Sequence, residues 1–212
     1  MEGISFRVLS YGYDTAADHP EPMESVVRDF LLKLNDLRRK TQTEALPILY
    51  IAHSLGGILL KSALMLSSEG LDILSSVPAA ALFFGVPANY ARDYERVCGE
   101  ANPQAESPHM QALRRDLMFL GSKNVQFEEA GLPSRYHCQY FLESTGLEDV
   151  RGLEEGELGR LPLQEKVKLS KGHGPMIRYA SRDEPDYQRI VACMKSAIER
   201  LLVEHEMPPA SR

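Results

Sequence analysis

The residues best suited to carry out chemistry lie around Ser54, in the stretch Ala52-His53-Ser54-Leu55-Gly56. An apolar run typical of a strand, 48–51, precedes this stretch, and 58–66 follow it with the spacing of a mostly buried helix. A serine at the apex of a strand-turn-helix is the nucleophile elbow written G-x-S-x-G. Ala52 replaces the first glycine, and Gly56 is predicted to be the small residue that the tight turn needs. We therefore predict that Ser54 is a nucleophile. The alternative is a Ser-Gly-Gly turn between a core strand and a core helix.

A serine hydroxyl becomes a good nucleophile only when a neighbouring base takes its proton. In hydrolases built around this elbow the acid follows the serine in the chain and the histidine comes last. His173 fits the base, because it follows the last predicted strand and has a glycine on each side. Glu143 directly follows a predicted strand and is the preferred acid, with Asp149 as the alternative. The competing interpretation is that His173 and Glu143 are ordinary surface residues of loops.

The other histidines fit the role of base less well. His53 adjoins Ser54 in the turn and is expected to point elsewhere. The remaining ones precede the elbow, lie within a strand, or lie at an end of a helix: His19, His109, His137 and His205.

Composition excludes several classes of function. The chain has 212 residues, 43% of them hydrophobic, and a net charge of −6 without a long basic run, which argues against nucleic-acid binding. The widely spaced Cys98, Cys138 and Cys193 form no C-x-x-C pair, so neither a zinc site nor a disulfide framework is predicted. The sequence has no signal-like apolar segment at its start and no apolar run of about 18 residues. We therefore expect a cytoplasmic protein without a transmembrane segment.

The spacing of apolar residues predicts one α/β domain over 1–206 and a flexible tail at 207–212. Nearly continuous apolar strands that alternate with amphipathic helices are typical of a parallel sheet covered on both faces. The predicted strands are 4–9, 48–51, 79–85, 136–142 and 165–169. The predicted helices are 24–40, 58–66, 110–120 and one that starts at 183–185, and 148–160 is predicted to be an acidic loop.

Several segments of the chain, taken in order, resemble a group of fungal α/β-hydrolase-like domains. These domains are related to serine active site-containing lipase-like proteins and to GPI inositol-deacylases. The resemblance extends from Phe6 to about Leu202 and implies an α/β-hydrolase fold, with a mostly parallel central sheet flanked by helices. It also implies a triad of Ser54, Glu143 and His173, with the Leu55 N–H as one oxyanion donor. The segments are YGYD, IAHSLGGILLKSAL, FFGVP, YFLEST and GHGPMIRYASRDEPDYQRIV.

Two departures from the family pattern bear on activity. The family usually has Thr and His where this chain has Val86 and Ala88, which puts substrate contacts there in doubt. Family members also have an earlier central strand, which ends in a His-Gly loop that supplies a second oxyanion donor. The chain starts at what looks like the following strand, so we expect a shortened member that lacks the first strands. Residues 6–9 should then pair directly with 48–51 or be held apart from them by an open slot, and the open slot is the favoured expectation.

The expected function is hydrolysis of a carboxylic ester, lipid-like or small. Ser54, His173 and Glu143 carry out this lipase- or esterase-like chemistry without a metal or organic cofactor. The alternative is a catalytically impaired domain of the same fold that serves as an interaction or signalling module, with a protein partner or a lost C-terminal domain. The complete order of serine, acid and histidine favours the enzyme, whereas the two departures favour the module.

Overall fold

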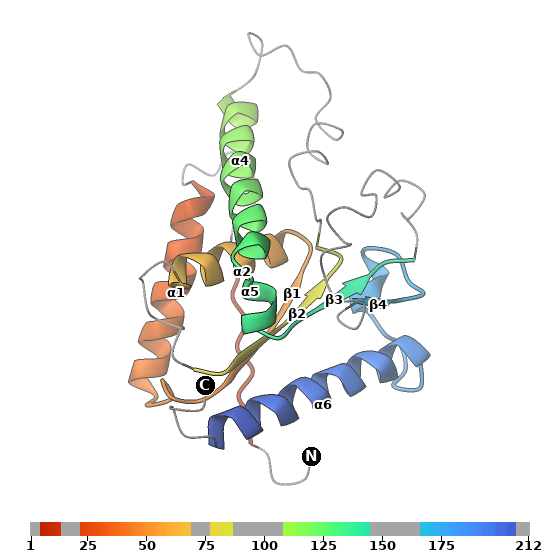
Figure 1. Ribbon diagram of the computed structural model, residues 1–212. Helices are drawn as coiled ribbons and strands as arrows, with labels where there is room; N and C mark the ends of the chain where they lie inside the picture. Colours follow the sequence, from red (N-terminus) through yellow and green to blue (C-terminus); the bar gives the residue numbers. More distant parts are fainter. Residues whose placement is uncertain (1–4, 14–21, 69–76, 87–107, 145–165, 207–212) are drawn as a thin grey trace.

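The computed structural model describes residues 5–13, 22–68, 77–86, 108–144 and 166–206, except for the side chains of 108–114 and 117. Its centre is a sheet of four parallel strands, in which each strand lies beside the one before it in the chain (Figure 1). The strands are β1 (Ile48–His53), β2 (Ala79–Phe84), β3 (Cys138–Leu142) and β4 (Lys166–Lys168). Because all four strands are parallel, their carboxyl ends lie at one edge of the sheet.

The central strand β2 explains why the core has two parts. All six of its residues are buried, and successive residues of a strand point to opposite faces. Ala79, Ala81 and Phe83 belong to a larger hydrophobic cluster on one face, and Leu82 and Phe84 belong to a smaller cluster on the other. A strand buried on both faces needs no polar side, which is why its sequence is an uninterrupted apolar run.

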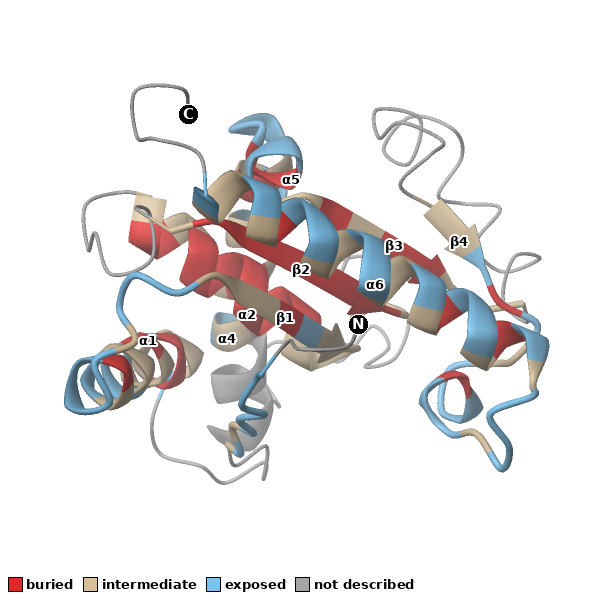
Figure 2. Ribbon diagram, turned by 90° about the horizontal axis from the view of Figure 1, so that it is seen from below, coloured by how far each residue is buried: buried red, intermediate tan, exposed pale blue. Residues whose placement is uncertain are grey.

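Helices cover both faces of the sheet. Figure 1 shows α1, α2, α4 and α5 on one side and α6 on the other, and Figure 2 shows α6 crossing the second face. The helices are α1 (Met23–Lys40), α2 (Leu55–Leu66), α4 (Pro108–Glu129), α5 (Leu132–Arg135) and α6 (Pro185–Glu206), and a short 3-10 helix, η6 (Pro175–Ile177), precedes α6. No helix in the described part of the chain combines the length and the apolarity that crossing a membrane requires.

Most of the predicted elements are confirmed, with shifts at their ends. The helix predicted at 110–120 continues to Glu129, and the short elements α5 and η6 were not predicted. The acidic loop at 148–160 and the tail at 207–212 lie outside the described residues. The fold is therefore a mixed α/β structure with a parallel sheet flanked by helices, as expected at that level.

The strand predicted at 4–9 is wrong, because residues 5–13 form neither helix nor strand. Phe6 and Val8 are 73% and 81% exposed. Side-chain contacts attach this segment to α1 and to the residue after it: the Tyr11 hydroxyl donates to Asp29 Oδ2 at 2.8 Å, and the Arg7 guanidinium donates to Thr41 Oγ1 at 2.9 Å. A strand needs a neighbouring backbone to satisfy its N–H and C=O groups. Among the described strands β1 pairs only with β2, so direct pairing of 6–9 with 48–51 is absent. The favoured alternative, an open slot between two strands, is absent too, because 6–9 do not form a strand.

Candidate active site

Three loops bring polar side chains together at the carboxyl edge of the sheet. Ser54 follows β1, Glu143 follows β3, and His173 lies in the loop after β4. Parallel strands place these loops at one edge, although Ser54 and His173 are 119 residues apart in the chain. Ligand sites of open parallel sheets lie at this edge. The structure thus places the three side chains singled out in the sequence next to one another.

Ser54 has a backbone conformation that is rare for a residue with a side chain, with φ 53° and ψ −128°. Such a conformation costs roughly 1–3 kcal/mol, so the surroundings must impose it. The Ser54 N–H donates to the Phe84 carbonyl at 2.9 Å, and the Gly57 N–H donates to the Ser54 carbonyl at 2.9 Å. A serine at this end of a helix usually caps it with its hydroxyl, but Ser54 makes no such bond. The strained turn therefore leaves the hydroxyl available for chemistry, as in a nucleophile elbow.

His173 lies between the serine and the carboxylate. Its Nε2 is 2.9 Å from Ser54 Oγ, and its Nδ1 is 3.5 Å from Glu143 Oε2. With a hydrogen on Nδ1, Nε2 can accept the serine proton. The Glu143 contact is long for a hydrogen bond, but such bonds tighten when substrate binds. The arrangement can therefore deprotonate Ser54 and stabilise the resulting imidazolium.

Among the described residues, Glu143 is the carboxylate beside Nδ1 of His173. Its side chain is 29% exposed and that of His173 is 45% exposed, so solvent reaches both groups. Asp149, the alternative acid, lies outside the described residues.

The first turn of α2 supplies main-chain N–H groups beside Ser54. Leu55 is the first residue of α2, and the first N–H groups of a helix have no partner within it. Within the described ranges no acceptor is bonded to the Leu55 N–H. The positive end of the helix dipole lies at the same place. Negative charge that develops next to Ser54 would therefore be stabilised there.

The crowded glycine of this turn is Gly57 and not Gly56. A Cβ on Gly56 would meet only an ordinary contact, with the Tyr13 hydroxyl at 3.6 Å, whereas a Cβ on Gly57 would overlap the Val86 side chain. The prediction that Gly56 is the residue that must be small is therefore wrong. The reason is that Val86, which comes just after β2, packs against the first turn of α2 at Gly57. Ala88 lies outside the described residues.

Gly85 leaves room for the imidazole of His173. Its φ is +52°, and a Cβ on it would lie 2.9 Å from both His173 Nδ1 and Met176 Sδ. Its N–H donates to the Phe141 carbonyl at 3.0 Å, which fixes its position. Glycine suits this position for two reasons, because a side chain would both strain the backbone and displace its neighbours.

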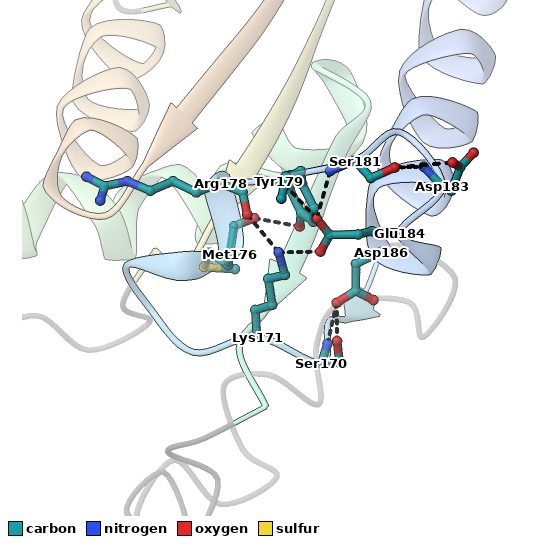
Figure 3. Close-up of polar contacts among 10 residues, drawn as sticks. Ser170, Lys171, Met176, Arg178, Tyr179, Ser181, Asp183, Glu184 and Asp186 are labelled. Atoms are coloured by element: carbon teal, nitrogen blue, oxygen red, sulfur yellow. Dashed lines mark hydrogen bonds and ion pairs between the residues drawn. The ribbon is translucent and has the colours of Figure 1, made fainter.

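The loop that carries His173 is attached to the start of α6, as Figure 3 shows. Lys171 Nζ is 2.6 Å from Glu184 Oε2, and it donates to the Arg178 carbonyl at 2.7 Å. Glu184 Oε1 accepts the main-chain N–H groups of Ala180 and Ser181 at 2.7 and 3.2 Å. The Lys171 hydrogen bond, together with these N–H groups, lowers the pKa of Glu184. The carboxylate thus remains charged and holds the segment that follows His173.

A second set of contacts holds the part of the same loop that precedes His173. Asp186 is 4% exposed, and its Oδ2 accepts the N–H and the hydroxyl of Ser170 at 2.7 and 2.6 Å (Figure 3). Ser144, next to Glu143, donates its N–H to the Lys171 carbonyl at 3.1 Å and its hydroxyl to the Ser170 carbonyl at 2.8 Å. The loops of the acid and the base are therefore bonded to each other through residues next to Glu143 and close to His173.

Sequence reasoning missed His53, which was expected to point elsewhere. Its Nε2 lies 3.0 Å from the His173 carbonyl oxygen, and the centroids of the two rings are 4.7 Å apart. The expectation is wrong because the β4–α6 loop returns to the end of β1. The alternation of β1 contained a partial signal, since His53 shares a strand face with Leu49, which packs against the cluster beneath α6.

The described residues contain no group of three or more His, Cys, Asp or Glu side chains arranged to hold a metal ion. No family model, curated protein or solved structure matches the chain.

Proposed function

We propose that the protein is a serine hydrolase that cleaves carboxylic esters. The observation that carries the proposal is the continuous contact from Ser54 Oγ through His173 to Glu143, at 2.9 and 3.5 Å, beside a strained turn between a strand and a helix. The chain order of serine, acid and histidine, each after its own parallel strand, supports an α/β-hydrolase fold of the lipase-like type that the sequence resembles.

The proposed reaction has two halves. His173 takes the Ser54 proton as Oγ attacks the ester carbonyl, and then gives that proton to the departing alcohol, so that an acyl-serine forms. In the second half His173 takes a proton from water as the water oxygen attacks the acyl carbon, and then gives that proton to Ser54 Oγ as the bond from Oγ to the acyl group breaks and the acid leaves. Glu143 stabilises the imidazolium in both halves, and the Leu55 N–H stabilises the oxyanion. The acyl and alcohol groups are small or lipid-like.

A non-catalytic interaction module of the same fold is the second candidate. Leu55 offers one oxyanion donor, and no second donor is identified among the described residues; one missing donor lowers a rate by about 10²–10³-fold. Exposed apolar side chains also favour a binding role, since Phe6 and Val8 lie in the N-terminal segment and Ile51 of β1 is 57% exposed. The two candidates differ in whether Ser54 reacts.

Hydrolysis of p-nitrophenyl acetate, butyrate and octanoate distinguishes the ester hydrolase from the interaction module. The wild-type protein should release p-nitrophenol faster than buffer, and Ser54→Ala should fall to the buffer rate. Ser134→Ala is the matched control, because Ser134 is exposed on α5, which leads into the opposite end of the sheet, and this variant should keep full activity. The dependence on acyl length separates small from lipid-like substrates. Equal rates in the wild type and Ser54→Ala would support the interaction module.

A further inference from the structure

The side chain of His53 touches the candidate base in two ways. Its Nε2 is 3.0 Å from the carbonyl oxygen of His173, and its ring lies 4.7 Å from the His173 ring, with 39° between the planes. His53 is also the residue directly before Ser54. One peptide bond therefore joins Ser54, the candidate nucleophile, to His53, which contacts the candidate base His173.

The direction of the hydrogen bond follows from the chemistry of its two atoms. A carbonyl oxygen can only accept, so Nε2 of His53 carries the hydrogen and donates it. Nε2 donates this bond whether or not Nδ1 also carries a hydrogen. An amide nitrogen on a side chain of similar length could make the same bond, and a hydrocarbon side chain could not.

His173 needs such a restraint because of its neighbours in the chain. Gly172 and Gly174 on either side have more conformational freedom than other residues. The tethers of this loop act on adjacent residues: the Lys171 carbonyl accepts from Ser144, and the Gly172 carbonyl accepts the Met176 N–H at 2.9 Å. In the part of the chain that the structure describes, the bond from His53 is the one hydrogen bond to the main chain of His173 itself.

We propose that His53 is a positioning residue, which holds the main chain of His173 so that its imidazole stays within reach of Ser54 and Glu143. This inference rests on the proposed hydrolase function for its effect on rate. The geometric part, a restraint on the loop, does not depend on catalysis. The end of β1 and the turn after it thus supply His53 and Ser54, and the β4–α6 loop supplies His173.

Two substitutions separate the donor from the bulk of the ring. His53→Leu removes the donor and should lower kcat for p-nitrophenyl butyrate by roughly 10- to 100-fold, because small displacements of a catalytic group cost this much. KM should change little, since the bond does not touch substrate. His53→Gln keeps a donor and should retain most of the wild-type kcat. Equal losses in both variants, or no loss in either, would overturn the proposal.

Amide hydrogen exchange tests the restraint independently of activity. The Met176 N–H is protected by its bond to the Gly172 carbonyl, so it reports on the order of the loop. Its exchange, followed by NMR, should be several-fold faster in His53→Leu than in the wild type, and unchanged in His53→Gln. If the wild type proves inactive but this pattern appears, the hydrolase proposal fails and the restraint stands. If exchange at Met176 is the same in all three proteins, the restraint itself is refuted.

Discussion

Replacing His173 by alanine is expected to lower kcat for ester hydrolysis by about 10⁴–10⁶-fold, close to the loss caused by Ser54→Ala. The two side chains act as one unit, since Nε2 lies 2.9 Å from Oγ and the hydroxyl has no other base among the described residues. The double variant should therefore lose no more activity than either single variant. Initial rates under saturating ester, compared across the four proteins, measure this.

His205→Ala is the matched control for the histidine. His205 lies in the last turn of α6, about 30 Å along that helix from the loop that carries His173. This variant should keep the wild-type kcat. If His173→Ala retains more than a tenth of the activity, or if the losses of the two single variants multiply in the double variant, His173 is not the base of Ser54.

Replacing Lys61 by alanine is expected to lower the free energy of unfolding by about 3–5 kcal/mol. Lys61 is 2% exposed on α2, and its Nζ is 2.7 Å from Glu128 Oε1 and 2.9 Å from Asn124 Oδ1, both on α4. Alanine would leave the buried Asn124 Oδ1 and the partly exposed Glu128 carboxylate without their cation, and would leave a cavity. The ammonium also lies within 5.0–5.6 Å of the ring centroids of Phe83, Phe127 and Tyr140. Urea unfolding measures the change.

Lys33→Ala is the control for this prediction. Lys33 forms an ion pair with Asp29 at 2.8 Å, but both side chains are largely exposed, so its loss should cost less than about 1 kcal/mol. Equal effects of the two substitutions would contradict the view that the buried ammonium holds α2, the helix that follows Ser54, against α4.

Local patterns were enough to predict much of the structure. The elbow around Ser54 and the buried strand β2 each depend on residues close together in the chain, and the sequence displays such short patterns directly. The positions of Glu143 and His173 could also be anticipated, because the ends of parallel strands share one edge of the sheet.

Features that depend on distant segments could not be predicted in this way. The apolar residues of 4–9 resemble a strand, but residues 5–13 pair with none of the described strands, and side-chain contacts of Arg7 and Tyr11 hold the segment instead. The contact of His53 with His173 and the packing of Val86 against Gly57 each join segments that are far apart in the chain, and no local sequence pattern indicates either contact. Lys61 stands in an apolar helix, and nothing in the sequence around it indicates that its ammonium lies among aromatic rings of other elements.

Reaction with a fluorophosphonate probe tests the central claim, an activated Ser54, most directly. The activated serine oxygen attacks phosphorus and displaces fluoride, so the protein gains the mass of the phosphonyl group. Peptide mass spectrometry should place this group on Ser54 in the wild type. Labelling should be absent in Ser54→Ala and strongly slowed in His173→Ala. A folded wild-type protein that remains unlabelled, or that carries the label on another residue, would contradict the account.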